Sequence, residues 1–229
     1  IQSGRNTLDA TTVKVGIRTL KFDPDKGFAL NGTWMKVKGV CIHPDAGVLG
    51  AAVPRDVIKH RLEVLKQYGA NAIRTAHNPQ TPFFYDICDE IGLLVMDEAY
   101  DEWEFPKKKW VEGWNIGTPS MDGTDDFFNE WSDRDVTDMV KRDRNHPCVM
   151  MWSIGNEIKD QYTEYGPVYA KEMIAMCHKM DPTRLVTAGN DEIASNTPAT
   201  PEYLAASEAD VEAKLVVRKI KEMLSNGHK

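Results

Sequence analysis

The feature that most constrains the fold is a regular alternation of short apolar runs with amphipathic helical patterns. The runs do not alternate polar and apolar residues, which is typical of strands buried on both faces of a sheet. A helical pattern lies between most pairs of consecutive apolar runs. This alternation predicts right-handed βαβ units and a parallel sheet. The apolar runs occupy residues 37–42, 71–76, 93–99, 149–155 and 185–189.

The helical patterns carry local start and stop signals. The pattern of residues 54–69 begins with a proline and an early aspartate, both favourable in a first turn, and ends on a glycine. Residues 82–92 repeat this design. A third helix is expected over residues 131–147, with Ser132 as its N-cap, and a fourth over residues 165–182.

The number of βα units leaves two folds open. A closed (β/α)8 TIM barrel has eight units and typically about 250 residues, whereas the pattern here is lost after Gly189 in a chain of 229 residues. The sequence therefore predicts an α/β fold of about five βα units, either an open parallel sheet or a partial TIM barrel. A separate strand is expected over residues 12–20, which alternate and are rich in β-branched residues.

A partial barrel would leave strand edges and apolar faces without cover. We expect Val40, Ile73 and Met151 to face the barrel interior, where further strands would shield them. Uncovered edges and faces favour association. The expected macromolecular partner is therefore a second copy of the chain or the missing half of the barrel.

Composition argues against several other functions. The net charge is −7 without a basic stripe, which gives no support for nucleic-acid binding. No apolar run approaches the roughly 20 residues that cross a bilayer, and residues 1–10 lack a signal-peptide pattern, so no membrane partner is expected and the compartment stays open. The 4 cysteines have no metal-like spacing.

Acidic and imidazole side chains gather where the predicted strands end. In a parallel α/β fold these ends meet at one rim, where reactive side chains lie. Scattered surface polarity would not produce this concentration, so the rim is predicted to be a site. The residues are His43, Asp45, Arg74, His77, Asn78, Asp97, Glu98, Asp101, Glu102, Asn156 and Glu157.

Several of these residues have a structural alternative. Arg74 either contacts substrate or pairs with a buried carboxylate such as Asp97 or Glu98, and His43 and His77 are either site residues or packed core histidines.

The loop after the third strand is expected to be solvated at Asp101 and Glu102. Trp103, Trp110 and Trp114 are expected to fill the core beneath this loop rather than to stack on a sugar.

Three linked motifs resemble glycoside hydrolase family 2, and most closely its β-galactosidases, with β-glucuronidases and β-mannosidases as relatives. They are "KGVCIHPDAGVLGAAVP" (38–54), "NAIRTAHNPQTPFFYDICDEIGLLVMDEAYDEW" (71–103) and "RDRNHPCVMMWSIGNE" (142–157). The resemblance implies a partial TIM-barrel catalytic domain over residues 23–189, preceded at 1–22 by a remnant of an immunoglobulin-like domain. Residues 190–229, a loop and an amphipathic helix, do not resemble the family.

The resemblance also implies roles for single residues. Glu157 matches the general acid/base of a retaining glycosidase, and Asn156 matches the asparagine that binds the sugar 2-hydroxyl. His43 and His77 match histidines that line the sugar pocket. The candidate substrate-binding set is Asn156, His43, His77, Asp45, Arg74 and Trp152.

A metal site is not predicted. Glu102 matches a carboxylate that binds magnesium in some family members, but Glu104 stands where these members have the partner histidine. Magnesium therefore stays a property of the parent family, and no cofactor is expected with certainty.

Retaining hydrolysis needs one protonated carboxyl and a second carboxylate about 5–5.5 Å away. We expect burial on the apolar run before Glu157 to raise the pKa of that carboxyl. The family supplies the nucleophile from a later strand, and nothing around Glu192 matches that motif. The sequence therefore predicts a fragment of a β-galactosidase-like glycosidase with little or no activity alone; robust turnover would make Glu98, Glu102 and Glu192 the first nucleophiles to test.

Other functions stay open. The chain could instead be a non-catalytic carbohydrate-binding or structural module, derive from a β-glucuronidase-type parent, or be an enzyme that another chain completes.

Overall fold

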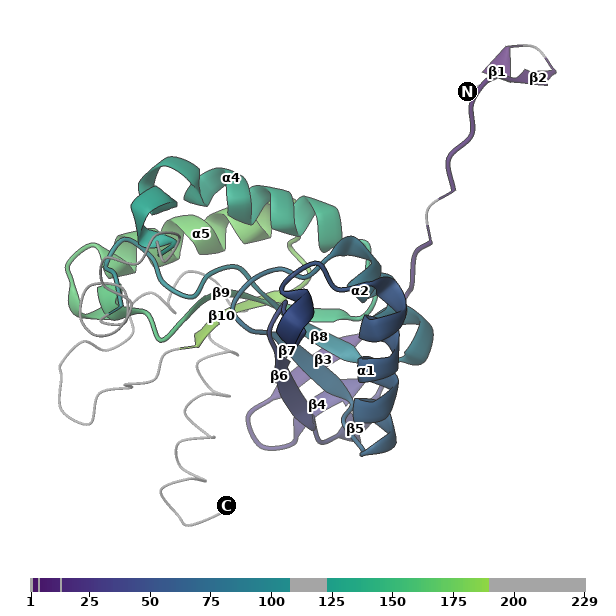
Figure 1. The fold of residues 1–229 in the computed structure, drawn as a ribbon, viewed down its shortest axis with the longest axis horizontal. Helices are drawn as coiled ribbons and strands as arrows, with labels where there is room; N and C mark the ends of the chain where they lie inside the picture. The colour runs from purple at the N-terminus through teal and green to yellow at the C-terminus, as the bar shows by residue number, and fades with distance from the viewer. Residues whose placement is uncertain (1, 4, 13, 108–122, 190–229) are drawn as a thin grey trace.

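The computed structural model describes residues 2–3, 5–12, 14–107 and 123–189. Its centre is a five-stranded sheet in the order β10-β9-β8-β7-β6, with each neighbouring pair parallel (Figure 1). This partial TIM barrel confirms the predicted fold class. The strands are β6 (Gly39–Ile42), β7 (Ala72–Thr75), β8 (Leu94–Glu98), β9 (Val149–Asn156) and β10 (Leu185–Gly189).

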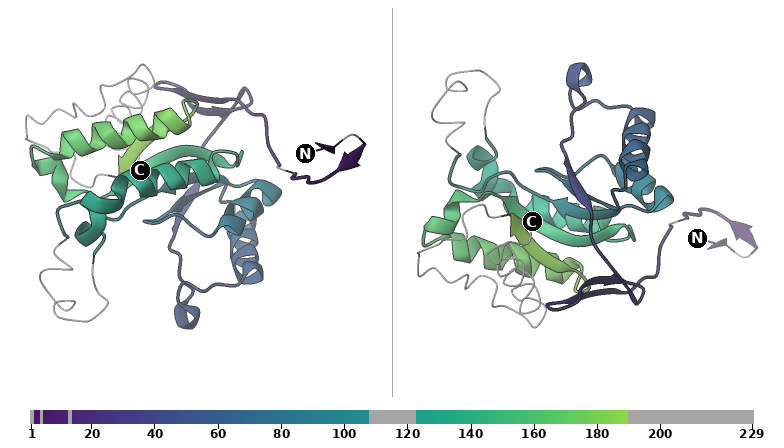
Figure 2. Two further views of the ribbon diagram at one scale, coloured as in Figure 1. Left: turned by 90° about the horizontal axis from the view of Figure 1, so that it is seen from above. Right: turned by 90° about the horizontal axis from the view of Figure 1, so that it is seen from below.

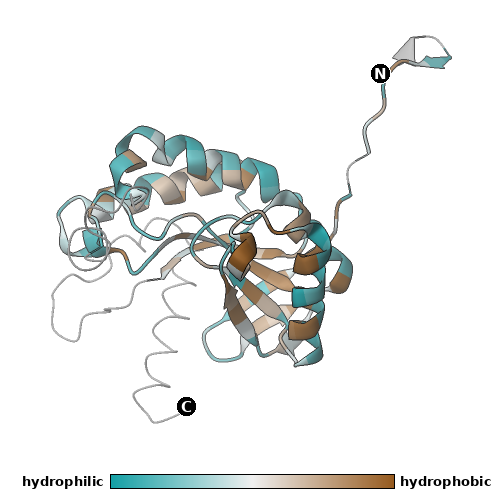
Figure 3. Cartoon of the chain, in the orientation of Figure 1, coloured by the Kyte–Doolittle hydropathy of each residue, from teal (hydrophilic) through white to brown (hydrophobic). Residues whose placement is uncertain are grey.

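Helices cover one face of this sheet. In Figures 1 and 2, α4 and α5 lie side by side over one part of the sheet, and α1 and α2 lie over the other part. Figure 3 shows apolar strands in the sheet and helices that carry both hydrophilic and hydrophobic residues. The helices are α1 (Arg55–Gln67), α2 (Pro82–Ile91), α4 (Asp125–Asp143) and α5 (Gly166–Met180), with short 3-10 helices η1 (Gly47–Leu49) and η2 (Lys159–Tyr162).

The strand register decides which side chains enter the core. Val40 pairs with Ile73, and both pack in the cluster between the sheet and the helices. The prediction that they face the barrel interior is therefore wrong, because alternate residues point to opposite faces and Arg74 occupies the inner one. Met151, in contrast, lies on the same face as Arg74, as predicted, because Met96 pairs with both residues; it packs with side chains of β3 to β5.

A small antiparallel sheet covers the N-terminal end of the barrel strands. It consists of β3 (Leu20–Asp23), β4 (Gly27–Leu30) and β5 (Thr33–Met35). Phe28 from this sheet packs against Ala72 and Leu94, which begin β7 and β8. One end of the parallel sheet is therefore closed by apolar contacts, which leaves chemistry to the opposite end.

The strand predicted over residues 12–20 is wrong over most of its length. Residues 14–19 are not in a strand, and β3 begins only at Leu20, where β4 supplies a partner. β3 therefore runs across the domain boundary expected at residue 22. Further upstream, β1 (Gln2–Ser3) and β2 (Asn6–Thr7) form a short hairpin.

Helix ends follow local signals in some places and not in others. α2 ends at Gly92, as predicted, in a left-handed conformation with φ 74°. α4 begins at Asp125 rather than near Ser132, so the predicted N-cap is wrong. Asp125 and Asp126 favour that earlier start because acidic side chains stabilise the first turn of a helix.

Some predictions lie outside the described residues, namely those on Trp110, Trp114 and residues 190–229. Among the residues that the structure describes, no helix is both long and apolar enough to span a membrane.

Candidate active site

Glu98, the last residue of β8, is the buried centre of the rim. Its side chain is 0% exposed, and Arg74 donates to both of its carboxylate oxygens at 2.9 Å. His77 Nδ1 lies 2.8 Å from Oε1, and Ser153 Oγ donates to Oε2 at 2.7 Å. β7, β8 and β9 therefore meet at a single carboxylate.

Arg74 joins this carboxylate to the end of β9. Besides pairing with Glu98, its Nη2 donates to Asn156 Oδ1 at 2.7 Å. Gly189 leaves room for the guanidinium, since a Cβ there would lie 2.7 Å from Nη2. The alternative that Arg74 pairs with a buried carboxylate is confirmed, and the carboxylate is Glu98.

Asn156 is held in one amide orientation. Its Oδ1 accepts from Arg74, and its Nδ2 donates to Asp101 Oδ1 at 3.0 Å. A side-chain amide has two N–H groups and two acceptor lone pairs. The contacts with described residues therefore leave one of each for a ligand hydroxyl.

Glu157 follows Asn156 and turns out of the strand. Its backbone has φ 47°, its N–H donates to the carbonyl of Gly189, and its side chain is 52% exposed. The burial expected for this carboxyl is therefore wrong, because the chain leaves the sheet at this residue. Lys107 Nζ lies 3.5 Å from Glu157 Oε2 and 2.5 Å from Asp101 Oδ1.

His43 and His77 lie together. Their rings are 5.1 Å apart in an edge-to-face arrangement, which places the end of β6 beside the Glu98 cluster. Asp45 is exposed, and its backbone carbonyl accepts from Arg61 at 3.0 Å. The structure therefore links every predicted substrate-binding residue to this network except Asp45 and Trp152.

Trp152 lies on the other face of the sheet. Its side chain is 0% exposed, and its indole N–H donates to Asp181 Oδ2 at 3.0 Å after the end of α5. Its assignment to substrate binding is wrong, because the register directs residue 152 towards the helices and residue 153 towards the site.

Trp103 fills the core, as predicted. It is 3% exposed, and its indole N–H donates to the carbonyl of Ile154 at 2.7 Å.

Glu102 is buried rather than solvated, which corrects the loop prediction. It is 1% exposed. Its carboxylate accepts the backbone N–H of Lys107 at 2.9 Å and that of Thr124 at 3.1 Å. Burial raises the pKa of Glu102 to about 7; the negative charges of Asp125 and Asp101 also raise it, and the two N–H groups lower it.

These contacts do not fit a magnesium site. Each Glu102 oxygen already accepts a backbone N–H. Glu104, which replaces the partner histidine, accepts from Asn129 at 2.8 Å and from the Tyr169 hydroxyl instead. A cation here would therefore have to share or displace these donors, and the partner imidazole is replaced by a glutamate that is already hydrogen-bonded.

Sequence reasoning missed Lys107 and Ser153. Ser153 is a polar residue inside an apolar run, and its place one residue after the outward Trp152 could have placed it on the site face. Lys107 begins three consecutive lysines, and nothing local distinguishes it from its neighbours. Glu98 and Glu102 are both buried with their carboxylates engaged, so neither fits the role of nucleophile. Glu192 lies outside the described residues.

The chain is similar in sequence to a known protein family and to several known proteins. The family model described as "Glycosyl hydrolases family 2, TIM barrel domain" matches residues 24–228. A β-galactosidase of Bacteroides ovatus, BoGH2A, is 38% identical over 223 residues, covering 84% of this chain and 25% of that protein.

Two other relatives carry other names. A β-glucuronidase of Bacteroides fragilis is 30% identical over 191 residues, 81% of this chain and 25% of that protein. The crystal structure of a β-glycosidase from Bacteroides vulgatus is 43% identical, with a TM-score of 0.72, over 82% of this chain and 22% of that one. The chain therefore spans about a quarter of the length of these two curated relatives.

Proposed function

The chain belongs to glycoside hydrolase family 2, and from that premise we propose that it supplies the acid/base side of an active site that hydrolyses terminal β-D-galactosides with retention. The observation that carries the proposal is the pair Asn156–Glu157 at the end of β9. The amide of Asn156 is oriented from both sides, and the carboxyl of Glu157 is open to a ligand.

Each residue has a defined task in the proposed reaction. Glu157 gives its proton to the glycosidic oxygen while the bond from that oxygen to the anomeric carbon breaks. A second carboxylate forms a bond to the anomeric carbon, and water then replaces it while Glu157 takes the proton from that water. The remaining N–H and lone pair of Asn156 bind the sugar 2-hydroxyl, and His43 and His77 line the pocket.

The second carboxylate is expected from residues that the structure does not describe. Glu98 is buried beneath Arg74, and Glu102 is occupied by two backbone N–H groups. We therefore expect background turnover but measurable galactose binding from the 229-residue chain alone. Robust turnover by that chain would make Glu192 the first nucleophile to test. Self-association of the chain stays a prediction.

Charge pairing favours a neutral sugar over a uronic acid. A uronate carboxylate needs a cation that is free to bind it. The two cations that the described residues bring to the site are Arg74, paired with Glu98, and Lys107, paired with Asp101. A β-glucuronide is the alternative substrate, supported by the named activity of the Bacteroides fragilis relative.

The test compares aryl β-galactosides with aryl β-glucuronides, using the natural protein purified with all of its residues. We expect hydrolysis of the galactoside, and Glu157→Gln to lower kcat by at least about 100-fold, the usual contribution of a general acid/base. Glu164→Gln, an exposed carboxylate nearby in sequence, is the matched control and should leave kcat unchanged. Galactoside turnover that survives Glu157→Gln contradicts the role of Glu157, and sugar binding without turnover of either glycoside would indicate a binding module.

A further inference from the structure

Lys107 is a buried cation between two carboxylates. Its side chain is 8% exposed, and its ammonium lies 2.5 Å from Asp101 Oδ1 and 3.5 Å from Glu157 Oε2. Its backbone N–H donates to Glu102 Oε2 at 2.9 Å. The residue is therefore fixed at both its backbone and its side-chain end.

The Asp101 contact links Lys107 to the rest of the site. Asp101 Oδ1 accepts from both Lys107 Nζ and Asn156 Nδ2, and Asn156 Oδ1 accepts from Arg74. The contacts form one continuous network between the two glutamates. It runs in the order Glu98, Arg74, Asn156, Asp101, Lys107 and Glu157, and negative and positive groups alternate on either side of the neutral amide of Asn156.

We propose that Lys107 is the positioning residue of this site: it fixes the carboxyl group of Glu157 directly and the amide of Asn156 through Asp101. The proposal rests on the proposed function, in which Glu157 moves the proton and Asn156 binds the sugar.

Among the residues that the structure describes, Lys107 is the charged group that contacts the Glu157 side chain. Glu157 leaves the strand with φ 47° and has a side chain that is 52% exposed, so the described residues pack against only part of it. Lys107, in contrast, is packed and bonded at both ends. A contact from a fixed donor to a half-exposed carboxyl restricts its orientation, and orientation of this kind contributes substantially to catalysis.

The contact also distinguishes the two carboxyl oxygens of Glu157. An ammonium can only donate, so the oxygen that faces Lys107 acts as an acceptor. The proton of the acid form is therefore carried by the other oxygen, Oε1, which passes it to the glycosidic oxygen. In the second step, the ammonium supports the ionised carboxylate that removes the proton from water.

The leaving group provides a test that a purely structural role would not meet. A weakly basic leaving group, such as 2,4-dinitrophenolate, departs with little help from an acid, whereas 4-methoxyphenolate needs protonation. A misplaced acid therefore slows hydrolysis of the 4-methoxyphenyl glycoside far more than hydrolysis of the dinitrophenyl glycoside. Loss of folded protein would slow both equally.

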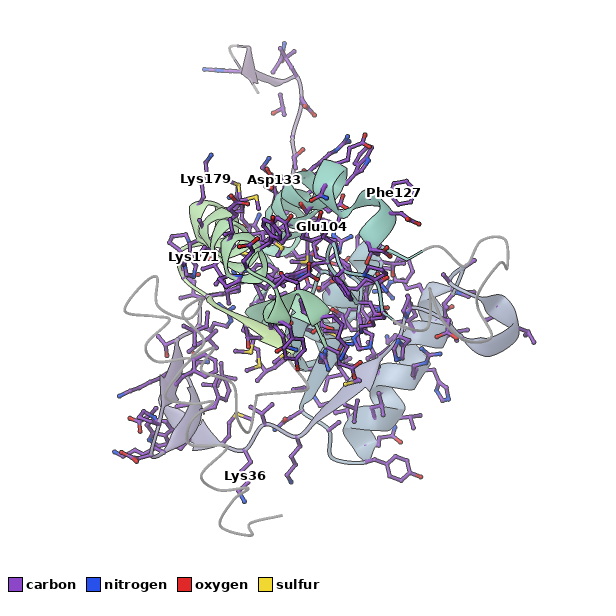
Figure 4. The ribbon with its side chains drawn as sticks, turned by 90° about the vertical axis from the view of Figure 1, so that its left-hand side faces the viewer. Lys36, Glu104, Phe127, Asp133, Lys171 and Lys179 are labelled. Atoms are coloured by element: carbon purple, nitrogen blue, oxygen red, sulfur yellow. The ribbon has the colours of Figure 1, made fainter. Side chains whose placement is uncertain are left out.

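The variants are Lys107→Met, Lys107→Arg, Glu157→Gln and the control Lys171→Met, measured in the natural protein with all of its residues. Lys171 is exposed on α5 (Figure 4). We expect Lys107→Met to lower kcat/KM on the 4-methoxyphenyl galactoside by about 10- to 100-fold and on the dinitrophenyl galactoside by less than about 3-fold, because kcat/KM reports the step in which the aryl group leaves. Lys107→Arg should recover most of kcat/KM, and Lys171→Met should have no effect.

The outcomes separate this inference from the proposed function. Equal losses on both glycosides, or no loss, in Lys107→Met would overturn the role of Lys107 when Glu157→Gln still shows the leaving-group dependence. If Glu157→Gln shows no such dependence, or the natural protein hydrolyses neither glycoside, the proposed function fails and this inference fails with it.

Discussion

Removing Arg74 should destabilise the fold much more than removing an arginine from a surface ion pair. In Arg74→Met, the fully buried carboxylate of Glu98 loses two hydrogen bonds of 2.9 Å. Breaking one side of a buried ion pair typically costs 3–5 kcal/mol. Ser153 and His77 still contact Glu98, and Arg74 itself is 26% exposed, so we expect the lower end of that range, about 3 kcal/mol.

A matched control is the pair Arg55–Glu90. Its atoms are 3.4 Å apart, and its side chains are 43% and 41% exposed. Exposed pairs of this kind contribute about 0–1 kcal/mol, so Arg55→Met should change the free energy of unfolding by less than about 1 kcal/mol. Both variants remove an arginine in favour of the same side chain, and they differ mainly in the burial of the carboxylate left behind.

The assay is urea unfolding followed by tryptophan fluorescence, with the free energy extrapolated to water. In a domain of this size, about 3 kcal/mol corresponds to a thermal midpoint lower by roughly 6–12 °C. The double variant Arg74→Met/Glu98→Gln should recover about 1 kcal/mol or more, because it removes the uncompensated charge. A loss no larger than that of Arg55→Met, or a double variant as unstable as the sum of the single ones, would refute the reasoning.

Two further predictions test the core and the pH dependence. Trp152→Phe removes the indole N–H that Asp181 accepts and should lower the free energy of unfolding by about 1–3 kcal/mol. Its galactose affinity, measured by calorimetry, should stay within about 2-fold of the wild type. Weaker binding at unchanged stability would instead show that Trp152 contributes to substrate binding. The hydrogen bond to Asp89 raises the pKa of His146 above 6.5. The contact between protonated His146 and Asp89 therefore stabilises the fold fully below about pH 6.5, and this stabilisation is lost as the pH rises through the folded-state pKa of His146. The stability difference between the wild type and Asp89→Asn should therefore narrow as the pH rises above about 6.5 in urea titrations, and a constant difference would contradict this.

Local signals predicted the elements well where the chain itself supplies the cause. The proline and the glycine that bound α2 act through their own backbone conformations, so the helix lies where the sequence placed it. α4 begins seven residues before Ser132, and its early start carries Phe128 into a contact with Trp103, 6.2 Å between ring centres. Such a distant contact has no local signature.

The same distinction applies to the candidate site. Residues that end strands, such as His77 and Asn156, could be predicted because parallel strands bring their ends to one rim. The burial of Glu102 could not be predicted, because Glu102 accepts the N–H of Thr124, which lies 22 residues further along the chain. Lys107 could not be predicted either, because the sequence does not distinguish it from the two lysines that follow it, and its place beside Glu157 depends on the path of the loop.

The carboxylate of Glu102 has a consequence for how this part of the chain can diverge. The backbone N–H groups of Lys107 and Thr124 bind its two oxygens, so both ends of the intervening segment are fixed to one side chain. These two backbone groups are 17 residues apart in the sequence, and a single carboxylate joins them. A replacement of Glu102 that lacks two acceptor oxygens would release one or both contacts, so the backbone on either side restricts which residue can stand at this position.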